Sequence, residues 1–470
     1  MRETTIGALA ERCEGALRAG QSARETLVTG VSTDTRTIRA GELFVPLTGE
    51  NHDGHDHAER ARAAGAAGTL WRLDRPVPEA LADWPLILVE NPLTALQRLA
   101  AAYRASLTAR VVAITGSNGK TTTKDMTAAA LQGAGNVRKT AGNLNNHIGL
   151  PLTILQTPPD TDTLVLELGM SDYGEIALLT AIARPDVAIV TNIGEAHLLQ
   201  LGSRAGIAQA KLEIAQGLQP GGLLLYNGDE PLLREAVPRL MLPEGARAQS
   251  FGCAEDNDWV ALDMEMTAYS STFRVRRAVD GQLASYAMPV PGRHNVLNAT
   301  AAIAAAQSLG EAPSRIQEGF AGLRLSAMRI EQQRAFNGAL VLNDAYNASP
   351  TAMRACIDLV ESLDGFDCRW LVLGDMLELG SQERELHEQV GAYLSPAKAE
   401  RVLAYGPLSR HLIAAAAPAY PDGEKALRHF ADKAALSDWL KTQLQPEDLV
   451  LVKGSRGMRM EHIVQAICAQ

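Results

Sequence analysis

The segment Val111–Met126, which reads VVAITGSNGKTTTKDM, carries the residues of this chain that most clearly predict a chemical role. An apolar run passes into a loop with two glycines and a lysine, and a helical sequence follows directly. In such an arrangement the loop N–H groups and the helix N-terminus bind phosphate oxygens, a lysine adds positive charge and a threonine hydroxyl binds Mg²⁺. We therefore predict a nucleotide phosphate-binding loop formed by Gly116, Ser117, Asn118, Gly119, Lys120, Thr121 and Thr122.

This loop is a variant, because Ile114 stands where the strict phosphate-loop pattern has its first glycine. A purely structural turn is the alternative interpretation. The GKTT sequence, placed between a strand and a helix, favours the nucleotide site.

Further polar residues follow the next apolar strands of the same region. The strand in TLVLELG brings Glu167 to its carboxyl end. Asn192 and His197 lie just past the end of the strand in VAIVTNIGEAH. Parallel strands would bring these residues beside the phosphate loop, where Glu167 and Thr121 offer the hard oxygen ligands that Mg²⁺ prefers. A capping role for Glu167 and a hydrogen-bonded loop position for His197 are the alternatives.

Lysine is used selectively, with nine lysines against thirty-five arginines. Before residue 398 the lysines are Lys120, Lys124, Lys139 and Lys211, so each is a candidate for a position that needs a primary amine. Lys124 and Lys139 are equally consistent with solvated side chains. Lys211 lies in the helical sequence SRAGIAQAKLEIAQGL, where a buried amine could lose its proton and form a carbamate with CO₂. A lysine that extends to solvent is the alternative.

Other candidate residues lie in later loops. Asn295 in PVPGRHNVLNAT could contact an adenine or act as a helix N-cap. Asp344 ends a strand and precedes Tyr346 and Asn347. A last strand is followed by Lys453, Ser455 and Arg456.

Composition excludes several classes of function. The chain has 470 residues, 21% charged residues and a formal net charge of −10, so it offers no basic field for nucleic acid. The five dispersed cysteines lack a CxxC pair and predict reduced thiols rather than disulfides or a thiolate metal site. The sequence contains no signal core and no run long and apolar enough to span a membrane. We expect a cytoplasmic protein with small-molecule ligands.

The element pattern predicts an α/β protein with three domains. The first, at 1–107, combines short strands such as Leu43–Leu47 and Leu86–Val89 with alanine-rich helices. The second, at 108–322, alternates apolar strands with helices, as in a parallel sheet, and has an antiparallel excursion in 250–291. The third, at 323–470, starts a new strand–helix series with a Rossmann-like pattern, and its predicted strands are ALVLND, RWLVLGD, RVLAYG and DLVLVKG.

Several ordered motifs together resemble the Mur ligases, ATP-dependent amide-forming enzymes of peptidoglycan synthesis, over essentially the whole chain. They are STDTR (32–36), FVPLTGENHDGHDHA (44–58), TAGNLNNHIGLPLT (140–153), PGRHNVLNA (291–299), LNDAYNASPTAM (342–353), GDMLELG (374–380) and KGSR (453–456). Within the family the motifs are most similar to the branch that adds D-alanyl-D-alanine to UDP-N-acetylmuramoyl-tripeptide. The resemblance implies a small N-terminal substrate domain, a central ATPase domain and a C-terminal Rossmann-like domain.

The resemblance also implies roles for individual residues. Lys120 and Thr121 would serve the phosphates and Mg²⁺, Glu167 and His197 the metal sites, and Lys211 would be carbamylated. Asn295 would face the adenine, and Arg329 and Asp344 would reach the nucleotide. One departure is visible, because Ala327 and Met328 precede Arg329 where family members commonly have Pro-Gly.

Substrate-binding residues follow from the same resemblance. The first domain would hold the uridine diphosphate through Ser32, Asp34, Arg36, Asn51, Asp53 and His55. Candidates for the sugar, the peptide and the dipeptide are Asn143, Asn145, Asn146, Tyr346, Asn347, Lys453, Ser455 and Arg456. We expect a monomer that binds ATP, the nucleotide-linked tripeptide and D-alanyl-D-alanine.

The expected reaction passes through an acyl phosphate, and no Ser-His-Asp or Cys-His arrangement in the sequence suggests a side-chain nucleophile. Two alternatives remain. One is a related ligase that adds a single amino acid or extends folate with glutamate. The other is a nucleotide-dependent switch without ligation, although the sequence lacks the NKxD motif of guanine recognition.

Overall fold

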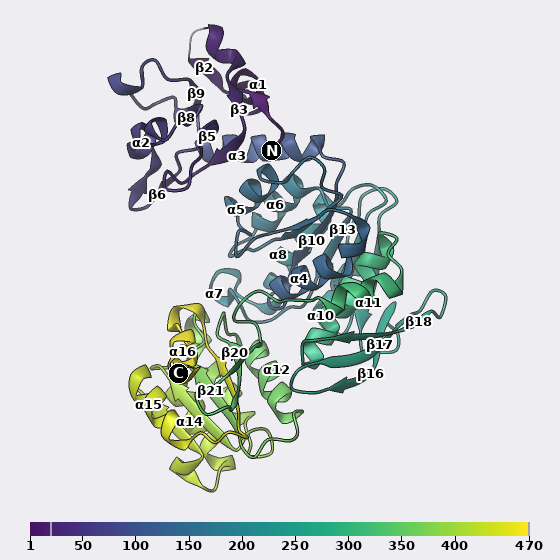
Figure 1. Cartoon of the computed structure of the whole chain (residues 1–470). Coiled ribbons are helices and arrows are strands. Elements are labelled where there is room, and N and C mark those ends of the chain that lie inside the picture. Colours follow the sequence, from purple (N-terminus) through teal and green to yellow (C-terminus); the bar gives the residue numbers. More distant parts are fainter. Residues whose placement is uncertain (19–20, 469–470) are drawn as a thin grey trace.

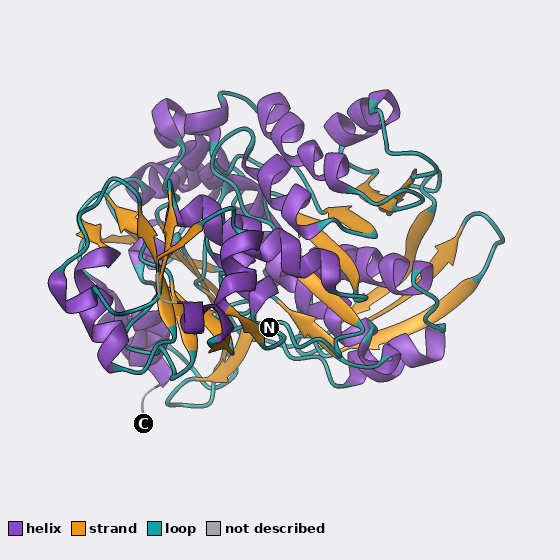
Figure 2. Cartoon of the chain, turned by 90° about the horizontal axis from the view of Figure 1, so that it is seen from above, coloured by secondary structure: helices purple, strands orange, loops and turns teal. Residues whose placement is uncertain are grey.

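The computed structural model describes residues 1–18 and 21–468. It consists of three α/β units arranged in chain order, with the first unit at one end and the last at the other (Figure 1). Helices flank the strands of the sheets (Figure 2). The predicted α/β class with three units is confirmed by the sheet topology. The boundaries near residues 107 and 322 stay predictions.

The first unit contains a five-stranded sheet of order β2-β9-β8-β5-β4. Four of its strands are parallel, and β2 pairs with β9 in the antiparallel direction at the edge. The predicted strand at Leu86–Val89 is confirmed, and the one at Leu43–Leu47 is shorter. The main elements are α1 (Ile6–Arg12), β2 (Ala16–Arg18), β4 (Gly30–Ser32), β5 (Glu42–Phe44), α2 (Ala58–Ala63), β8 (Gly68–Arg72) and β9 (Leu86–Val89).

The helix α3 (Pro92–Ser106) links this unit to the central one. It begins sharply, because the Asn91 side chain accepts hydrogen bonds from two N–H groups of the first turn and Pro92 occupies the first helical position. Further along, the Tyr103 hydroxyl donates to the Thr157 carbonyl at 2.7 Å, and the Arg104 Nε donates to the Ala183 carbonyl at 2.8 Å. Near the middle of the helix, Gln97 Nε2 donates to the His147 carbonyl at 3.0 Å. The helix is therefore attached to the central unit at its middle and in its last turn.

The central unit is built on a nine-stranded sheet of order β11-β12-β10-β13-β14-β15-β16-β17-β18. Strands β11 to β16 are parallel, and β16, β17 and β18 form the antiparallel excursion that the alternating sequence predicted. Its strands are β10 (Arg110–Thr115), β11 (Val137–Lys139), β12 (Thr163–Glu167), β13 (Val187–Val190), β14 (Leu223–Asn227), β15 (Arg247–Gly252), β16 (Trp259–Met266), β17 (Ser271–Arg277) and β18 (Leu283–Met288). Its helices are α4 (Lys120–Ala130), α5 (Gly149–Leu155), α6 (Glu175–Ala183), α7 (Leu198–Leu201), α8 (Arg204–Leu212), α9 (Pro231–Ala236), α10 (Arg293–Ser308) and α11 (Pro313–Ala321).

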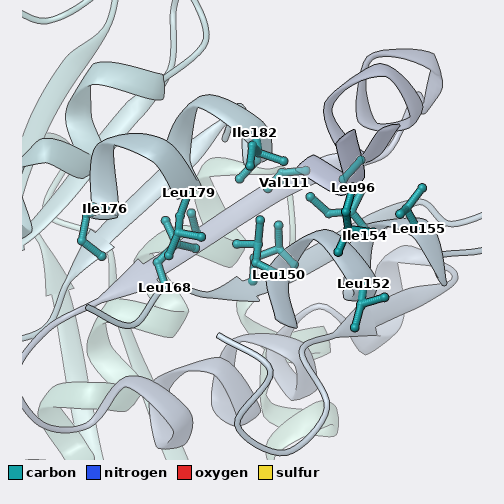
Figure 3. Close-up of a cluster of buried hydrophobic side chains, with 14 of the residues drawn as sticks. Leu96, Val111, Leu150, Leu152, Ile154, Leu155, Leu168, Ile176, Leu179 and Ile182 are labelled. Carbon is teal, nitrogen blue, oxygen red and sulfur yellow. The ribbon is translucent and has the colours of Figure 1, made fainter. Parts of the chain in front are cut away.

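Two apolar cores cover the two faces of the central sheet. One contains α4, α10 and α11, and the other contains α3, α5, α6 and α8. Figure 3 shows part of the second core, where Leu150, Leu179 and Ile182 lie with Leu96 of α3. Burying a side chain of this size stabilises the fold by about 1.5–3 kcal/mol. This core therefore fixes α3, and with it one side of the first unit, to the central sheet.

The third unit has a six-stranded sheet of order β19-β20-β24-β21-β22-β23, parallel except for β19. The sequence predicted four of these strands and missed β19 and β23. The elements are β19 (Glu331–Arg334), β20 (Leu340–Asp344), α12 (Pro350–Glu361), β21 (Arg369–Gly374), α13 (Glu383–Ala392), β22 (Arg401–Tyr405), α14 (Ser409–Ala416), β23 (Leu427–Phe430), α15 (Lys433–Gln443), β24 (Leu449–Lys453) and α16 (Glu461–Cys468).

The central and third units also touch through the β16–β17 hairpin. Ala268 at its tip is buried in a core of the third unit, and the Tyr269 hydroxyl accepts a hydrogen bond from Arg334 of β19 at 2.7 Å. None of the described helices is long and apolar enough to cross a membrane.

Candidate functional site

The predicted phosphate loop connects β10 to α4, and its two glycines are required by geometry. Gly119 has φ 80°, and a Cβ there would lie 2.6 Å from Asn298 Oδ1. Gly116 has φ 150°, and a Cβ there would overlap the Thr191 hydroxyl. Any larger residue at these two positions would be strained and would push the loop away from its neighbours.

Hydrogen bonds to the two residues that follow β13 hold the loop in place. Ser117 N donates to the Asn192 carbonyl at 3.0 Å, and Asn118 N donates to Asn192 Oδ1 at 2.9 Å. The Thr191 hydroxyl donates to the Asn118 carbonyl at 2.6 Å. The loop is therefore preorganised by the neighbouring strand, and its shape does not depend on a bound ligand.

The Lys120 ammonium lies over the loop. Its Nζ donates to the carbonyls of Gly116 at 2.9 Å and Ser117 at 3.3 Å. Burial lowers the pKa of this amine, while the nearby Glu167 raises it. A phosphate group could replace the two carbonyl partners with a stronger, charge-assisted interaction.

Glu167 ends β12 and pairs in register with Ile114 of β10, which places it beside the loop. Its Oε1 accepts a hydrogen bond from Asn145 Nδ2 at 2.8 Å. Its Oε2 is buried and has no hydrogen-bond partner among the described residues. The Lys124 ammonium lies 3.9 Å from this oxygen, which is too far for a hydrogen bond, so Oε2 can still accept a direct partner such as a cation.

His197 follows β13 in a left-handed conformation with φ 66°. Burial, and then the neighbouring Lys120 and Lys211, lower the pKa of its imidazole to about 4. The ring is therefore neutral near pH 7 and can coordinate a metal. Across the described residues, no group of three or more His, Cys, Asp or Glu side chains is placed to hold a metal alone. A cation here would need oxygen ligands from a phosphate or water.

Lys211 lies in α8, which Ser203 caps by accepting a hydrogen bond from Gly206 N at 3.1 Å. The lysine is 1% exposed, so the alternative of a side chain that extends to solvent is wrong. Burial, followed by the charge of Lys120, holds its pKa well below the ordinary value. Within the described parts of the chain, Lys211 Nζ takes part in no hydrogen bond. A neutral, unpaired amine is the form that can react with CO₂.

The third unit reaches the phosphate loop through the linker that precedes β19. Arg329 Nη2 donates to the Thr121 hydroxyl at 2.8 Å, and the guanidinium lies 4.2 Å from the centre of the Tyr346 ring. The departure before this arginine falls on a left-handed part of the backbone. Met328 adopts φ 58°, a left-handed conformation that glycine would take without strain, and Ile330 adopts φ 54°.

Other contacts join the same two units. The Ser349 hydroxyl donates to Asn118 Oδ1 at 3.1 Å, and the Thr351 hydroxyl donates to Glu195 Oε2 at 2.7 Å. The N-terminus of α12 therefore lies directly against the phosphate loop. Sequence reasoning missed Glu195 and Thr351, because neither belongs to a recognisable motif.

Asp344 and Lys453 form a buried ion pair at the ends of β20 and β24. Lys453 Nζ also donates to the Asn347 carbonyl at 3.0 Å. The Asn295 amide donates to the Pro291 carbonyl at 2.7 Å. The N-cap of α10 is Gly292, so the alternative of Asn295 as N-cap is wrong.

A cavity of about 490 Å³ between the central and third units gathers most of the predicted residues. Those that line it are Ser117, Asn118, Gly119, Lys120, Thr121, Thr122, Asn145, Asn146, Glu167, His197, Asn295, Arg329, Asp344, Tyr346, Asn347 and Lys453. Gly116, Asn143, Lys211, Ser455 and Arg456 lie outside its lining. Ser455 is buried and accepts a hydrogen bond from Leu377 N at 2.9 Å, and Arg456 pairs with Glu461 at 2.8 Å.

The predicted substrate residues of the first unit form local contacts away from this cavity. Arg36 pairs with Asp34 at 2.7 Å and, mainly through a hydrogen bond, lowers the pKa of that carboxyl to about 2. Ser32 Oγ donates to the Asp34 carbonyl at 3.2 Å. Asn51 is exposed.

In the second loop of this unit, His55 Nδ1 lies 2.7 Å from Asp53, and its ring is buried against Trp71. The structure therefore places His55 inside the unit rather than on a binding surface.

Three family models match this chain. Residues 27–104 match "Mur ligase family, catalytic domain", residues 114–306 match "Mur ligase middle domain", and residues 328–456 match "Mur ligase, glutamate ligase domain". Together with the phosphate loop and the linker arginine, these matches define a three-domain ATP-binding ligase. The chain belongs to the Mur ligase family.

Individual relatives narrow the similarity. The chain is 45% identical to the UDP-N-acetylmuramoyl-tripeptide–D-alanyl-D-alanine ligase of Bacillus subtilis, over 99% of this chain and 98% of that one. Its structure is similar to a crystal structure of MurF from Acinetobacter baumannii, with a TM-score of 0.88, 29% identity and full coverage of both chains. It is also similar to MurF ligase from Thermotoga maritima in complex with ADP, with a TM-score of 0.82, 29% identity and coverage of 94% and 97%.

The left-handed Met328 generates the first prediction. Met328→Gly should raise the free energy of unfolding by about 1 kcal/mol, because glycine takes positive φ without strain. Ala327→Gly is the matched control, since the neighbouring alanine is outside that region and the change should cost about 0.5–1 kcal/mol. Urea unfolding followed by tryptophan fluorescence measures both. Equal losses in the two variants would show that Met328 is not strained.

Acid stability provides a second prediction. Burial lowers the pKa of both His197 and His294 to about 4. The unfolded chain takes up protons at these rings near pH 6.5 and the folded chain does not, so stability should fall as pH drops from about 6.5 to 4. His294→Gln should remove part of this loss in thermal unfolding across that range. His52→Gln, at an exposed position, should leave it unchanged, and an identical pH dependence in both variants would refute the assignment.

Proposed function

We propose that this chain joins D-alanyl-D-alanine to the terminal carboxylate of UDP-N-acetylmuramoyl-tripeptide while ATP is converted to ADP and phosphate. One observation carries the proposal most directly. Arg329 of the linker donates to Thr121 of the phosphate loop in the same cavity where Glu167 presents an unpartnered carboxylate oxygen. The name of the similar Bacillus subtilis ligase supplies the identity of the two substrates that are joined.

The phosphate loop binds and orients the ATP phosphates. The N–H groups at the start of α4 point toward them, and Lys120 exchanges its two carbonyl partners for phosphate oxygens. Arg329 adds a second positive charge from the opposite side of the cavity. These groups stabilise the charge that spreads over the equatorial oxygens during phosphoryl transfer.

Mg²⁺ fits the residues beside this loop. Thr121, Glu167 and His197 would hold it, since the buried Glu167 Oε2 has no hydrogen-bond partner among the described residues and the His197 ring is neutral. Bound there, the metal supplies further charge to the transferring group. Asn145 positions Glu167 for this role through its hydrogen bond to Oε1.

Chemistry then proceeds in two transfers. The tripeptide carboxylate attacks the γ-phosphorus, the bond to the bridging oxygen breaks, and ADP leaves an acyl phosphate behind. The uncharged amine of D-alanyl-D-alanine attacks the acyl carbon, and the tetrahedral adduct expels inorganic phosphate as the amide forms. Water would destroy the acyl phosphate, so the contacts of Ser349 and Thr351 with the central unit serve to exclude it.

The carbamate on Lys211 is part of the proposal. The buried amine has a pKa well below its ordinary value, mainly because of burial, so a large neutral fraction is available for CO₂. The carbamate would be an anion on a helix beside His197 and Lys120. The positive charge of Lys120 favours this anion. The resulting carboxylate-like group would complete the oxygen ligands for a second Mg²⁺.

The first unit would bind the uridine diphosphate end of the substrate through Ser32, Asp34, Arg36, Asn51 and Asp53. His55 is buried behind Asp53 and would hold that carboxylate in place. Asn143 and Asn146 would contact the sugar or peptide. Tyr346, Asn347, Lys453, Ser455 and Arg456 would face the dipeptide side. We propose a monomer that works in the cytoplasm, where ATP and nucleotide-linked sugars are made.

The reaction gives the third prediction. Purified protein with UDP-N-acetylmuramoyl-tripeptide should release phosphate from ATP when D-alanyl-D-alanine is added, and the product should gain the mass of that dipeptide less water. Lys120→Ala should lower this rate at least about 1,000-fold, because it removes a charge from the transition state. Single amino acids, glutamate among them, replace the dipeptide in the comparison reactions. Phosphate release that is the same with and without an acceptor would favour a nucleotide switch. Phosphate release that depends on a single amino acid would favour another ligase of the family.

The carbamate gives the fourth prediction. Lys211→Arg should lose activity at least about 100-fold while remaining folded, because a guanidinium keeps its charge and cannot form a carbamate. Protein equilibrated with ¹³C-bicarbonate should show a carbamate carbon in its NMR spectrum, and the variant should not. Lys398→Arg, a surface ion-pair lysine of the third unit, is the control. A fully active Lys211→Arg protein would rule out the modification.

A further inference from the structure

Asp125, a residue with no role in the reaction described above, is buried on the helix of the phosphate loop. It lies on α4 one turn after Thr121 and is 1% exposed. Its Oδ2 accepts two hydrogen bonds from Ser326, one from the backbone N at 2.8 Å and one from the hydroxyl at 2.7 Å. A carboxylate that is taken out of water in this way needs its partners, because an unpaired buried charge is strongly destabilising.

Two lysines supply the compensating charge. Lys139 Nζ donates to Asp125 Oδ1 at 2.6 Å, and Lys124 Nζ lies 3.6 Å from the same oxygen. Burial raises the pKa of Asp125, but these two ammonium groups and the hydrogen bonds outweigh it and the pKa is lowered. Lys124 is 1% exposed, so its interpretation as a solvated lysine is wrong. The carboxylate is therefore ionised and can accept from Ser326 with charge-assisted strength.

Ser326 stands at the start of the linker that carries Arg329. The far end of this linker is held by the third unit, where Ile330 N donates to Asp344 Oδ1 at 3.2 Å and Met328 N donates to Glu331 Oε2 at 3.1 Å. Between the two attachments the backbone takes left-handed conformations at Met328 and Ile330. Residues in that region persist only where the surroundings fix them, so both attachments are needed to hold this shape.

The arginine between these two attachments points at the helix that anchors the linker. Arg329 donates to Thr121, and Thr121 and Asp125 are four residues apart on α4, so they share one face of the helix. One helix thus carries both the anchor of the linker and the target of its arginine. Arg329 Nε is buried without a partner among the described residues, so Thr121, the Tyr346 ring and the linker backbone hold the guanidinium.

We propose that Asp125 is a positioning residue of the nucleotide site, which fixes the linker through Ser326 so that Arg329 reaches Thr121 and the ATP phosphates. The proposal rests on the proposed function for the role of ATP. It assigns Lys139 and Lys124 the task of keeping the Asp125 carboxylate ionised inside the protein.

The test compares the binding of ADP, measured by isothermal titration calorimetry, in matched variants. Asp125→Asn should weaken binding about 10-fold or more, because it replaces charge-assisted hydrogen bonds to Ser326 with weaker neutral ones and so loosens the linker that carries Arg329. Ser326→Ala, a milder change, should weaken it by a smaller factor. The control is Asp258→Asn, since Asp258 also accepts from the N and hydroxyl of one serine, Ser250, at 2.7 and 3.2 Å, but outside the cavity. It should bind ADP as the unchanged protein does.

A double variant shows whether Asp125 acts through the arginine. Combined with Arg329→Ala, Asp125→Asn should weaken ADP binding no further. Trypsin should cut the linker after Arg324 or Arg329 faster in Asp125→Asn than in the Asp258→Asn control. Unchanged ADP binding in both Asp125→Asn and Ser326→Ala, or an equal further loss in the Arg329→Ala background, would overturn the proposal.

These measurements need neither tripeptide nor dipeptide. A protein that binds ADP but ligates nothing would contradict the proposed function, and the same binding series would still decide the role of Asp125. If Asp125→Asn does not fold, Ser326→Ala alone decides it.

Discussion

The hydrogen bond between Arg329 and Thr121 is the interaction on which the arrangement of this protein depends. It joins the linker of the third unit to Thr121 of the phosphate loop, the residue proposed above as a metal ligand. The cavity lies where the two units meet, and its predicted lining comes from loops and from the adjoining ends of helices and strands of both units. A change that separates these units would dismantle the site without altering either sheet.

Buried charge is the second theme of the central unit. Lys124 and Lys211 are 1% exposed and Lys120 is half-buried. Glu167 lies near Lys120 and Lys124, Asp125 lies near Lys124, and Lys211 lies near Lys120. Each charge costs free energy to bury unless another group compensates it. Phosphate, metal and carbamate would supply that compensation, so this region is built for ligands that bring their own charges.

Much of this arrangement could be predicted from the sequence, because the relevant signals are local. The spacing of the glycines and the lysine predicts the phosphate loop. Apolar runs of four to six residues predict β10, β12 and β13. The short strands β19 and β23 were missed, since EQQR carries no apolar pattern and LRHF is brief. The contact of Asp125 with Ser326 spans 201 positions, and no spacing rule connects residues so far apart. For the same reason Lys124 was taken for a solvated lysine, although tertiary packing buries it.

The helix α3 has a consequence for the choice of substrate. It is about 22 Å long, belongs at one end to the first unit, and is packed against the central core and hydrogen-bonded to the central unit at its middle and in its last turn. The first unit is therefore held at a set distance from the phosphate loop rather than on a flexible tether. If that unit binds the uridine end of the substrate, the fixed distance selects substrates by their length. Only a peptide stem whose length matches this distance brings its carboxylate to the γ-phosphate. The spacing of the units therefore discriminates between substrates of different length, independently of any contact with the terminal residue.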